Sequence, residues 1–137
     1  MATVRRQIQI DASAASAWDA IRDFGAVHER VVPGFVVDCR LDGDARVVTF
    51  FTGNVQREPL VDLDDEARRL VYGAIDSPLG ATHYNGSVQV LGDGENECRV
   101  EWIVDFLPDE LGDVLGQLMD RAAESMRRTL GRAGDVR

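Results

Sequence analysis

The chain has 137 residues, of which 45% are hydrophobic and 28% charged, as expected for one soluble globular domain over 1–137. Its formal net charge of −9 argues against nucleic acid or anionic membranes as main partners, because both attract lysine and arginine. All 15 basic residues are arginine, and the absence of lysine excludes Schiff-base chemistry through a lysine side chain.

Targeting and cofactor signals are weak throughout the chain. It has no run of about 20 apolar residues for membrane insertion, and no signal peptide precedes the first expected strand, so we expect a cytoplasmic protein. Cys39 and Cys98 form no CxxC motif and are expected to be reduced thiols packed as small apolar groups. With only His28 and His83 as histidines, and no P-loop or dinucleotide motif, we expect no metal and no cofactor.

The first elements expected are one strand followed by two short helices. Residues 4–10 show a partial alternation of apolar and polar side chains, which predicts a strand. Asp11 and Ser13 are N-cap candidates for a helix that Gly25 ends, and a second helical turn is stopped by Pro33-Gly34.

Six further strands are expected between residues 35 and 106. Their ranges are 35–42, 46–52, 55–63, 69–75, 82–91 and 98–106. In the first of them, one side carries the apolar residues Phe35, Val37, Cys39 and Leu41 and the other side carries charges. Pro59 indicates an edge position or a bulge, because proline cannot donate to a strand ladder.

A long amphipathic helix is expected over residues 111–130. Its apolar residues are spaced three or four apart: Leu111, Val114, Leu115, Leu118, Met119, Ala122, Met126 and Leu130. Such a face needs a long apolar surface to lie on, which an antiparallel sheet of many strands would provide.

This order of elements resembles the helix-grip fold of the START-like superfamily, which includes birch-pollen-type allergens, abscisic-acid receptors and polyketide cyclase/dehydrase-like bacterial proteins. The segments that carry the resemblance are 17–24 (AWDAIRDF), 57–65 (REPLVDLDD) and 100–106 (VEWIVDF). The resemblance implies an α+β fold, in which a strongly bent seven-stranded antiparallel sheet wraps around a long C-terminal helix. It also implies a largely apolar cavity between them.

The resemblance further implies which residues line this cavity. They are Phe24, His28, Phe35, Val48, Phe50, Leu60, Tyr72, Tyr84, Trp102, Leu115, Met119 and Met126. Glu58 lies in an Arg-Glu-x-Leu pattern whose glutamate often points into the cavity in the resembling family. Alternatively, Pro59 turns Glu58 toward solvent, or Glu58 pairs with a nearby arginine. The alternative for His28 is a surface or capping role, and the alternative for Tyr72 and Tyr84 is an ordinary core role. His83 is expected to face outward.

Our leading prediction is the binding or transport of a small hydrophobic molecule, such as a lipid, polyketide or aromatic metabolite. Glu58, Tyr72 and Tyr84 would then be the few polar groups that orient it. The alternative is a polyketide cyclase or dehydratase in which Glu58, partly desolvated, acts as general acid or base. A third interpretation is an interaction module whose cavity is filled by aromatics. A hormone-receptor role is disfavoured by the tight turn at 52–55 and the missing lysine. The sequence leaves a homodimer open.

Overall fold

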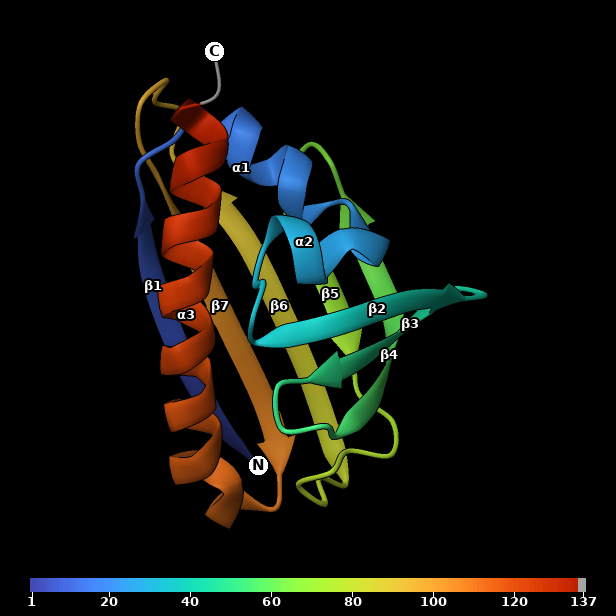
Figure 1. The fold of residues 1–137 in the computed structure, drawn as a ribbon. Coiled ribbons are helices and arrows are strands. Elements are labelled where there is room, and N and C mark those ends of the chain that lie inside the picture. Colours follow the sequence, from blue (N-terminus) through green and yellow to red (C-terminus); the bar gives the residue numbers. More distant parts are fainter. Residues whose placement is uncertain (136–137) are drawn as a thin grey trace.

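The computed structural model describes residues 1–135, with side chains described to residue 131, and shows a curved antiparallel sheet packed against one long helix (Figure 1). The strands are β1 (Ala2–Ile10), β2 (Val36–Asp42), β3 (Ala45–Phe50), β4 (Val55–Asp64), β5 (Arg69–Gly73), β6 (His83–Leu91) and β7 (Cys98–Leu107). The helices are α1 (Ala14–Ile21), η1 (Phe24–Ala26), α2 (Val27–Arg30), η2 (Asp109–Leu111) and α3 (Gly112–Asp135). This element order confirms the predicted α+β helix-grip fold.

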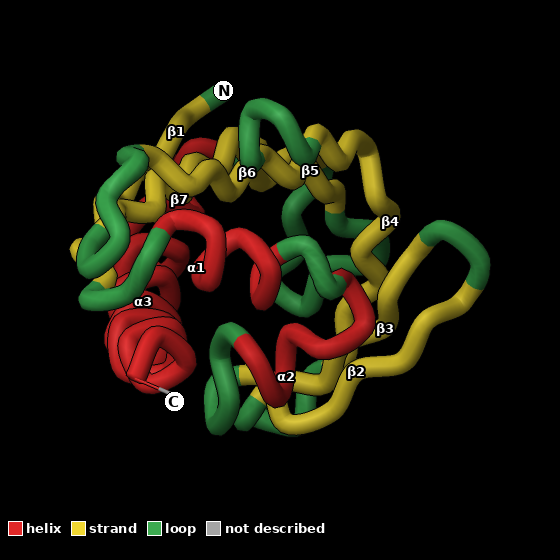
Figure 2. The backbone as a smooth tube through the Cα atoms, turned by 90° about the horizontal axis from the view of Figure 1, so that it is seen from above, coloured by secondary structure: helices red, strands yellow, loops and turns green. Residues whose placement is uncertain are grey.

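The sheet is one continuous ladder of seven strands in the order β1-β7-β6-β5-β4-β3-β2, with all neighbours antiparallel. From above, the strands form a curved wall, α3 lies along its open side, and α1 and α2 lie inside the curve at the near end (Figure 2). The most regular strand is β7, in which every second residue from Cys98 to Phe106 is buried, as its alternation predicted.

Helix α3 buries most of the predicted apolar face against the sheet, although Val114 is 38% exposed and Leu111 lies in η2. Leu115, Met119, Ala122, Met126 and Leu130 are each at most 5% exposed. Within residues 1–135, the structure contains no helix with the length and hydrophobicity of a membrane-spanning segment.

Helix α1 is fixed by a cap at one end and by an aspartate of the β4–β5 turn at the other. The Ser13 hydroxyl accepts a hydrogen bond from the backbone N–H of Ser16 at 3.0 Å, so Ser13 rather than Asp11 is the N-cap. The indole Nε1 of Trp18 and the Nε of Arg22 both donate to Oδ1 of Asp65, at 2.9 and 2.8 Å. These contacts position α1 over one end of the curved sheet.

The sequence pattern placed Val37 and Leu41 on one apolar side with Phe35, but the structure does not bury these two residues. Val37 is 54% exposed and Leu41 is 60% exposed. The pairing of β2 with β3 shifts register between Val36 and Asp38, and this bulge accounts for the exposure of Val37. Leu41 pairs with Arg46 and stays on the same face as Cys39, where it lies next to Gly25 but remains exposed. Of the two alternatives for Pro59, the bulge is the better description, because β4 lies inside the sheet and its pairing with β5 shifts between Leu60 and Asp62.

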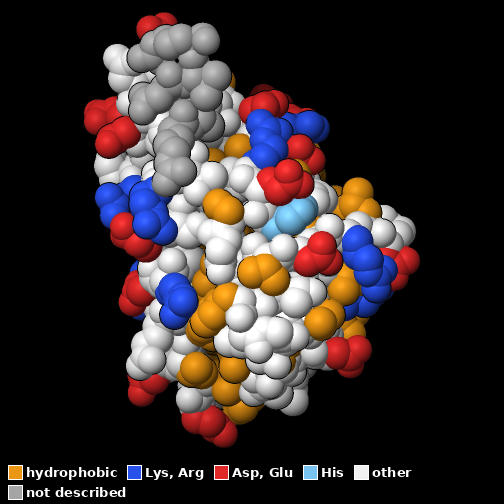
Figure 3. Space-filling model, viewed as in Figure 1, with side chains coloured by type: hydrophobic (Ala, Val, Ile, Leu, Met, Phe, Trp, Pro, Cys, Tyr) orange, Lys and Arg blue, Asp and Glu red, His pale blue; other side chains and the backbone are white. Residues whose placement is uncertain are grey.

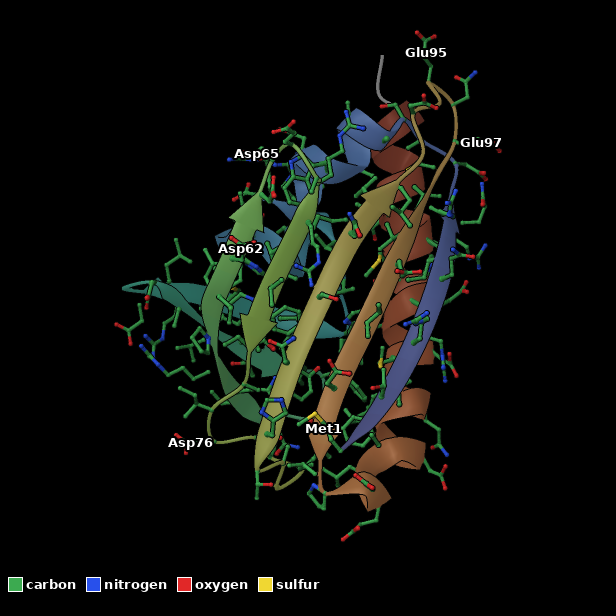
Figure 4. All side chains as sticks on the ribbon, turned by 180° about the vertical axis from the view of Figure 1, so that it is seen from behind. Met1, Asp62, Asp65, Asp76, Glu95 and Glu97 are labelled. Carbon is green, nitrogen blue, oxygen red and sulfur yellow. The ribbon has the colours of Figure 1, made fainter. Side chains whose placement is uncertain are left out.

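Acidic side chains lie around the outside of the molecule. In the view from behind, those labelled at the turns and on the outer face are Asp62, Asp65, Asp76, Glu95 and Glu97 (Figure 4), and all five are exposed. The concave face of the sheet, by contrast, carries apolar side chains together with a small group of polar ones.

Candidate functional site

A cavity of about 330 Å³ lies between the concave face of the sheet and helix α3. Ten of the residues predicted to line it do so: Phe35, Val48, Phe50, Glu58, Tyr72, Tyr84, Trp102, Leu115, Met119 and Met126. The sequence analysis did not identify the remaining lining residues: Ile21, Val27, Val31, Val32, Val36, Arg46, Phe51, Thr52, Asn54, Gln56, Leu70, Pro78, Leu79, Val88, Val114, Leu118 and Ala122. Whether any of them contacts a ligand stays a prediction.

The two sides of the cavity differ in chemistry. The side formed by α3 and by the segment around α2 is apolar, with valines, leucines, methionines and Ala122. The side formed by β3 to β7 carries a group of buried polar side chains, described below. A ligand that fills the cavity would therefore have apolar contacts on the helix side and both apolar and polar contacts on the sheet side.

The centre of the polar side is a buried ion pair between neighbouring strands. Arg46 on β3 lies opposite Glu58 on β4, and its Nε donates to Oε1 of Glu58 at 2.8 Å. The side chains of the two residues are only 8% and 7% exposed. Gln56 donates from its amide nitrogen to the other carboxylate oxygen, Oε2, at 2.7 Å. Both oxygens of Glu58 are therefore hydrogen-bonded within the protein.

Aromatic rings and a backbone carbonyl hold the guanidinium of Arg46. Its central carbon lies 4.2 Å from the ring centroid of Phe24 and 5.2 Å from that of Tyr72, both within the range of cation–π attraction. Its Nη1 donates to the backbone carbonyl of Phe24 at 3.2 Å. The prediction that Phe24 lines the cavity is wrong, because its ring packs against this guanidinium instead.

Two tyrosines extend the polar side. The ring centroids of Tyr72 and Tyr84 are 6.1 Å apart, and the Tyr72 hydroxyl accepts a hydrogen bond from Nε1 of Trp102 at 3.1 Å. Burial, reinforced by the nearby Glu58 carboxylate, raises the pKa of Tyr72 to about 12. Burial also raises the pKa of Tyr84 well above its usual value, with Tyr72 and Glu58 contributing. Both phenols are therefore uncharged at neutral pH.

A glycine in β6 makes room for the Tyr72 ring. Gly86 pairs with Tyr72 across the β5–β6 ladder, and the ring lies directly over it. A Cβ atom at Gly86 would lie 2.5 Å from Cζ and 2.8 Å from the hydroxyl oxygen of Tyr72. The position of this phenol thus depends on the missing side chain.

The cavity opens where the β3–β4 turn, the β5–β6 loop and the start of α3 meet. Its exposed lining residues all lie there: Thr52, Asn54, Pro78 and Val114. Beside this mouth, the guanidinium of Arg121 on α3 stacks 4.0 Å from the ring centroid of Phe51. In the space-filling view, hydrophobic side chains gather between α3 and the β3–β4 hairpin (Figure 3). A ligand would enter at this end.

The structure places two further predicted lining residues, His28 and Leu60, away from the cavity wall. His28 belongs to the four-residue helix α2, whose buried residue is Val27; the imidazole Nε2 instead lies 3.2 Å from Oε1 of Glu29. Its buried Nδ1 has no hydrogen-bond partner among the described residues. Leu60 packs against the core from β4, but the cavity ends along that strand at Glu58. His83 is exposed, as expected.

Arg46 and Gln56 are the buried polar residues of the cavity wall that the sequence analysis missed. A signal for Arg46 was present: it lies two and four residues before Val48 and Phe50, so strand alternation places all three on one face. Across the part of the chain whose side chains the structure describes, no group of three His, Cys, Asp or Glu residues is arranged to hold a metal ion.

Comparison with known proteins agrees with this architecture. The model of the family described as polyketide cyclase / dehydrase and lipid transport matches residues 1–134. A solved structure from Thermobifida fusca is 30% identical, with a TM-score of 0.81, and the match covers 98% of this chain and 95% of that one. No curated protein sequence matches at a significant level.

Two more distant structures share the fold. A protein from Bacillus thuringiensis is 20% identical, with a TM-score of 0.84, over 94% of this chain and 98% of that one. A point mutant of norcoclaurine synthase from Thalictrum flavum, in complex with a transition-state analogue, is 20% identical, with a TM-score of 0.70, over 94% and 93%. The family match over nearly the whole length leads to one conclusion. The chain belongs to the polyketide cyclase/dehydrase and lipid transport family.

Proposed function

We propose that the protein binds and carries a small hydrophobic molecule in the cavity between the sheet and α3. The observation that supports this most strongly is the cavity itself, whose volume of about 330 Å³ is at the small end of the range of about 300–1,000 Å³ for small-molecule sites. Its wall is mostly apolar with a few convergent polar groups, which is the usual composition of such sites.

The apolar wall would supply most of the affinity. Burial of apolar ligand surface contributes about 25 cal/mol per Å² before the costs of association are subtracted. Met119 and Met126 suit this role, because the unbranched methionine side chain adapts to different ligand shapes. The exposed residues at the mouth give the ligand a route into the cavity.

The hydrogen bonds of Glu58 favour binding over acid–base catalysis. A general acid or base has to exchange a proton with the substrate, whereas both oxygens of Glu58 accept hydrogen bonds from Arg46 and Gln56. This arrangement favours a fixed hydrogen-bond acceptor that orients a ligand. In the alternative, a cyclase or dehydratase, Glu58→Gln would abolish turnover, whereas a carrier would keep much of its affinity.

The experiment is native mass spectrometry of the purified protein, followed by denaturing extraction. We expect a stoichiometric hydrophobic passenger or, in protein without one, uptake of the neutral dye N-phenyl-1-naphthylamine with increased emission. Ala122→Leu places extra volume in the cavity and should weaken uptake, because Ala122 is buried on the cavity wall. Ala15→Leu is the matched control, since Ala15 is exposed on α1. If the protein carried no passenger and also took up no dye, the proposal would be overturned.

A further inference from the structure

We infer that the ligand is uncharged and compact, with an apolar body and one hydrogen-bonding group, such as a hydroxyl or carbonyl, directed at the sheet side of the cavity. This inference rests on the proposed function and adds the chemical class of the ligand. Three properties of the cavity support it: its charge balance, its remaining hydrogen-bonding capacity and the placement of its polar atoms.

The charges inside the cavity cancel. Arg46 and Glu58 are the charged side chains on its wall, and they pair with each other at 2.8 Å. A ligand carboxylate would give up its hydration to meet a guanidinium that is already paired, and it would be repelled by Glu58. A ligand ammonium would give up its hydration to meet a carboxylate that is already paired, and it would be repelled by Arg46. Burying an unpaired charge is costly, so the cavity selects against both.

The polar side chains keep unused hydrogen-bonding capacity. A carboxylate has about four lone-pair sites, and the two hydrogen bonds from Arg46 and Gln56 leave acceptor sites on Glu58 open. The phenols of Tyr72 and Tyr84 are uncharged at neutral pH, so each keeps an O–H donor, and the Tyr72 oxygen already accepts one hydrogen bond from Trp102. A hydroxyl or carbonyl group matches this mixture of donors and acceptors.

The placement of these groups gives the ligand an orientation. Arg46, Gln56, Glu58, Tyr72 and Tyr84 all come from β3 to β6, whereas the opposite side of the cavity is formed by apolar residues of α3. A bound molecule would turn its polar group toward the sheet and its apolar body toward the helix. The small volume favours a compact ring system over a lipid with two acyl chains.

The test compares three compounds with the same two-ring body, naphthalene, 2-naphthol and 2-naphthoate, as competitors of bound N-phenyl-1-naphthylamine at pH 7. One hydrogen bond should make 2-naphthol bind about threefold to tenfold more tightly than naphthalene. The uncompensated charge should make 2-naphthoate at least about tenfold weaker than 2-naphthol. This inference would be overturned, while the proposed function stood, if either 2-naphthoate or naphthalene bound as tightly as 2-naphthol. If neither the dye nor any competitor bound, the proposed function itself would fail.

Glu58→Gln tests the charge argument directly. The substitution leaves Arg46 without its carboxylate partner, so the ratio of 2-naphthoate to 2-naphthol affinity should rise at least about tenfold. An unchanged ratio in folded protein would contradict the inference. If this variant does not fold, the double variant Arg46→Met with Glu58→Leu keeps the cavity neutral. It should still reject 2-naphthoate, because no unpaired guanidinium is present to receive the carboxylate. Binding of 2-naphthoate as tight as that of 2-naphthol by this variant would overturn the inference.

Discussion

Two arginine–carboxylate pairs in this molecule have the same Nε–oxygen distance and different surroundings. In the first, Nε of Arg46 donates to Glu58 at 2.8 Å; in the second, Nε of Arg22 donates to Asp65 at 2.8 Å. The side chains of the first pair are 8% and 7% exposed, whereas those of the second are 45% and 59% exposed. Both pairs also contact an aromatic residue, Phe24 in one case and Trp18 in the other.

The difference shows that bond length alone does not indicate what an ion pair contributes. Water screens the exposed pair, and each of its partners stays hydrated if the other is removed. The buried pair has lost its hydration, so each partner depends on the other. The exposed pair of Arg22 and Asp65 helps to attach α1 to the β4–β5 turn. The buried pair of Arg46 and Glu58 provides the polar side of the cavity.

The largest expected effect comes from removing one partner of the buried pair. Glu58→Leu leaves the Arg46 guanidinium buried without a counter-charge, and we expect a loss of about 3–5 kcal/mol in the free energy of unfolding. Urea denaturation followed by circular dichroism measures it. Adding Arg46→Met to this variant should recover most of the loss, because apolar side chains then replace both charges. A single variant as stable as the original protein would contradict our description of this pair.

A smaller loss is expected from crowding the Tyr72 ring. Gly86→Ala should destabilise the protein by about 1–3 kcal/mol, since the ring must move away from the new methyl group. The hydrogen bond from Trp102 to Tyr72 would break, which a change in tryptophan fluorescence would report. Gly73→Ala is the matched control: its Cβ would meet its nearest neighbour, the Tyr84 carbonyl oxygen, at 3.5 Å, an ordinary contact. Equal effects of the two substitutions would be evidence against the close packing of this ring.

The buried polar side should also be visible in a pH titration. Tyr72 and Tyr84 are the only tyrosines, so tyrosinate absorbance at 295 nm reports on them alone. In the unfolded chain they ionise near their usual pKa of about 10, whereas burial raises the pKa of Tyr72 to about 12 and that of Tyr84 well above its usual value. Between these values the folded state holds more protons, so stability falls as the pH rises above about 10. Tyrosinate absorbance in folded protein at pH 10 would contradict this prediction.

The smallest effect is expected from the exposed pair. Asp65→Asn removes the charge that faces Arg22 but keeps a side-chain oxygen that can accept the hydrogen bond from Trp18. The urea midpoint should change little, and any change should shrink at high salt, because the interaction is screened. A loss of stability comparable to that of Glu58→Leu would remove the contrast between the two pairs.

The sequence predicted the fold well where the periodicity was regular. The alternation in β7 and the three-to-four spacing in α3 each predict one buried face, and the structure buries residues on those faces. The pattern failed at Val37, because the bulge in β2 depends on pairing with β3 and leaves no mark on local alternation.

The candidate site was predicted less completely, for a related reason. Strand patterns indicate the face on which a side chain lies. They do not indicate which side chains on that face reach the cavity and which are covered by others. Phe24 was expected at the cavity and instead covers Arg46, which was not expected there. Counting outward from a Gly53-Asn54 turn would pair Glu58 with Thr49, whereas the observed hairpin is centred on Thr52 and pairs Glu58 with Arg46. The register that forms this ion pair was therefore not within reach of the turn signal.

Methionine methyl NMR tests the central claim, that a small apolar molecule binds inside this cavity, most directly. The protein has three methionines, of which Met119 and Met126 line the cavity and are 1% and 3% exposed, whereas Met1 is 69% exposed. With 13C-methyl-methionine protein, titration with N-phenyl-1-naphthylamine should shift the Met119 and Met126 signals and leave the Met1 signal in place. Binding of the dye without any shift of the two cavity methionines would contradict the claim, because the molecule would then lie elsewhere on the protein.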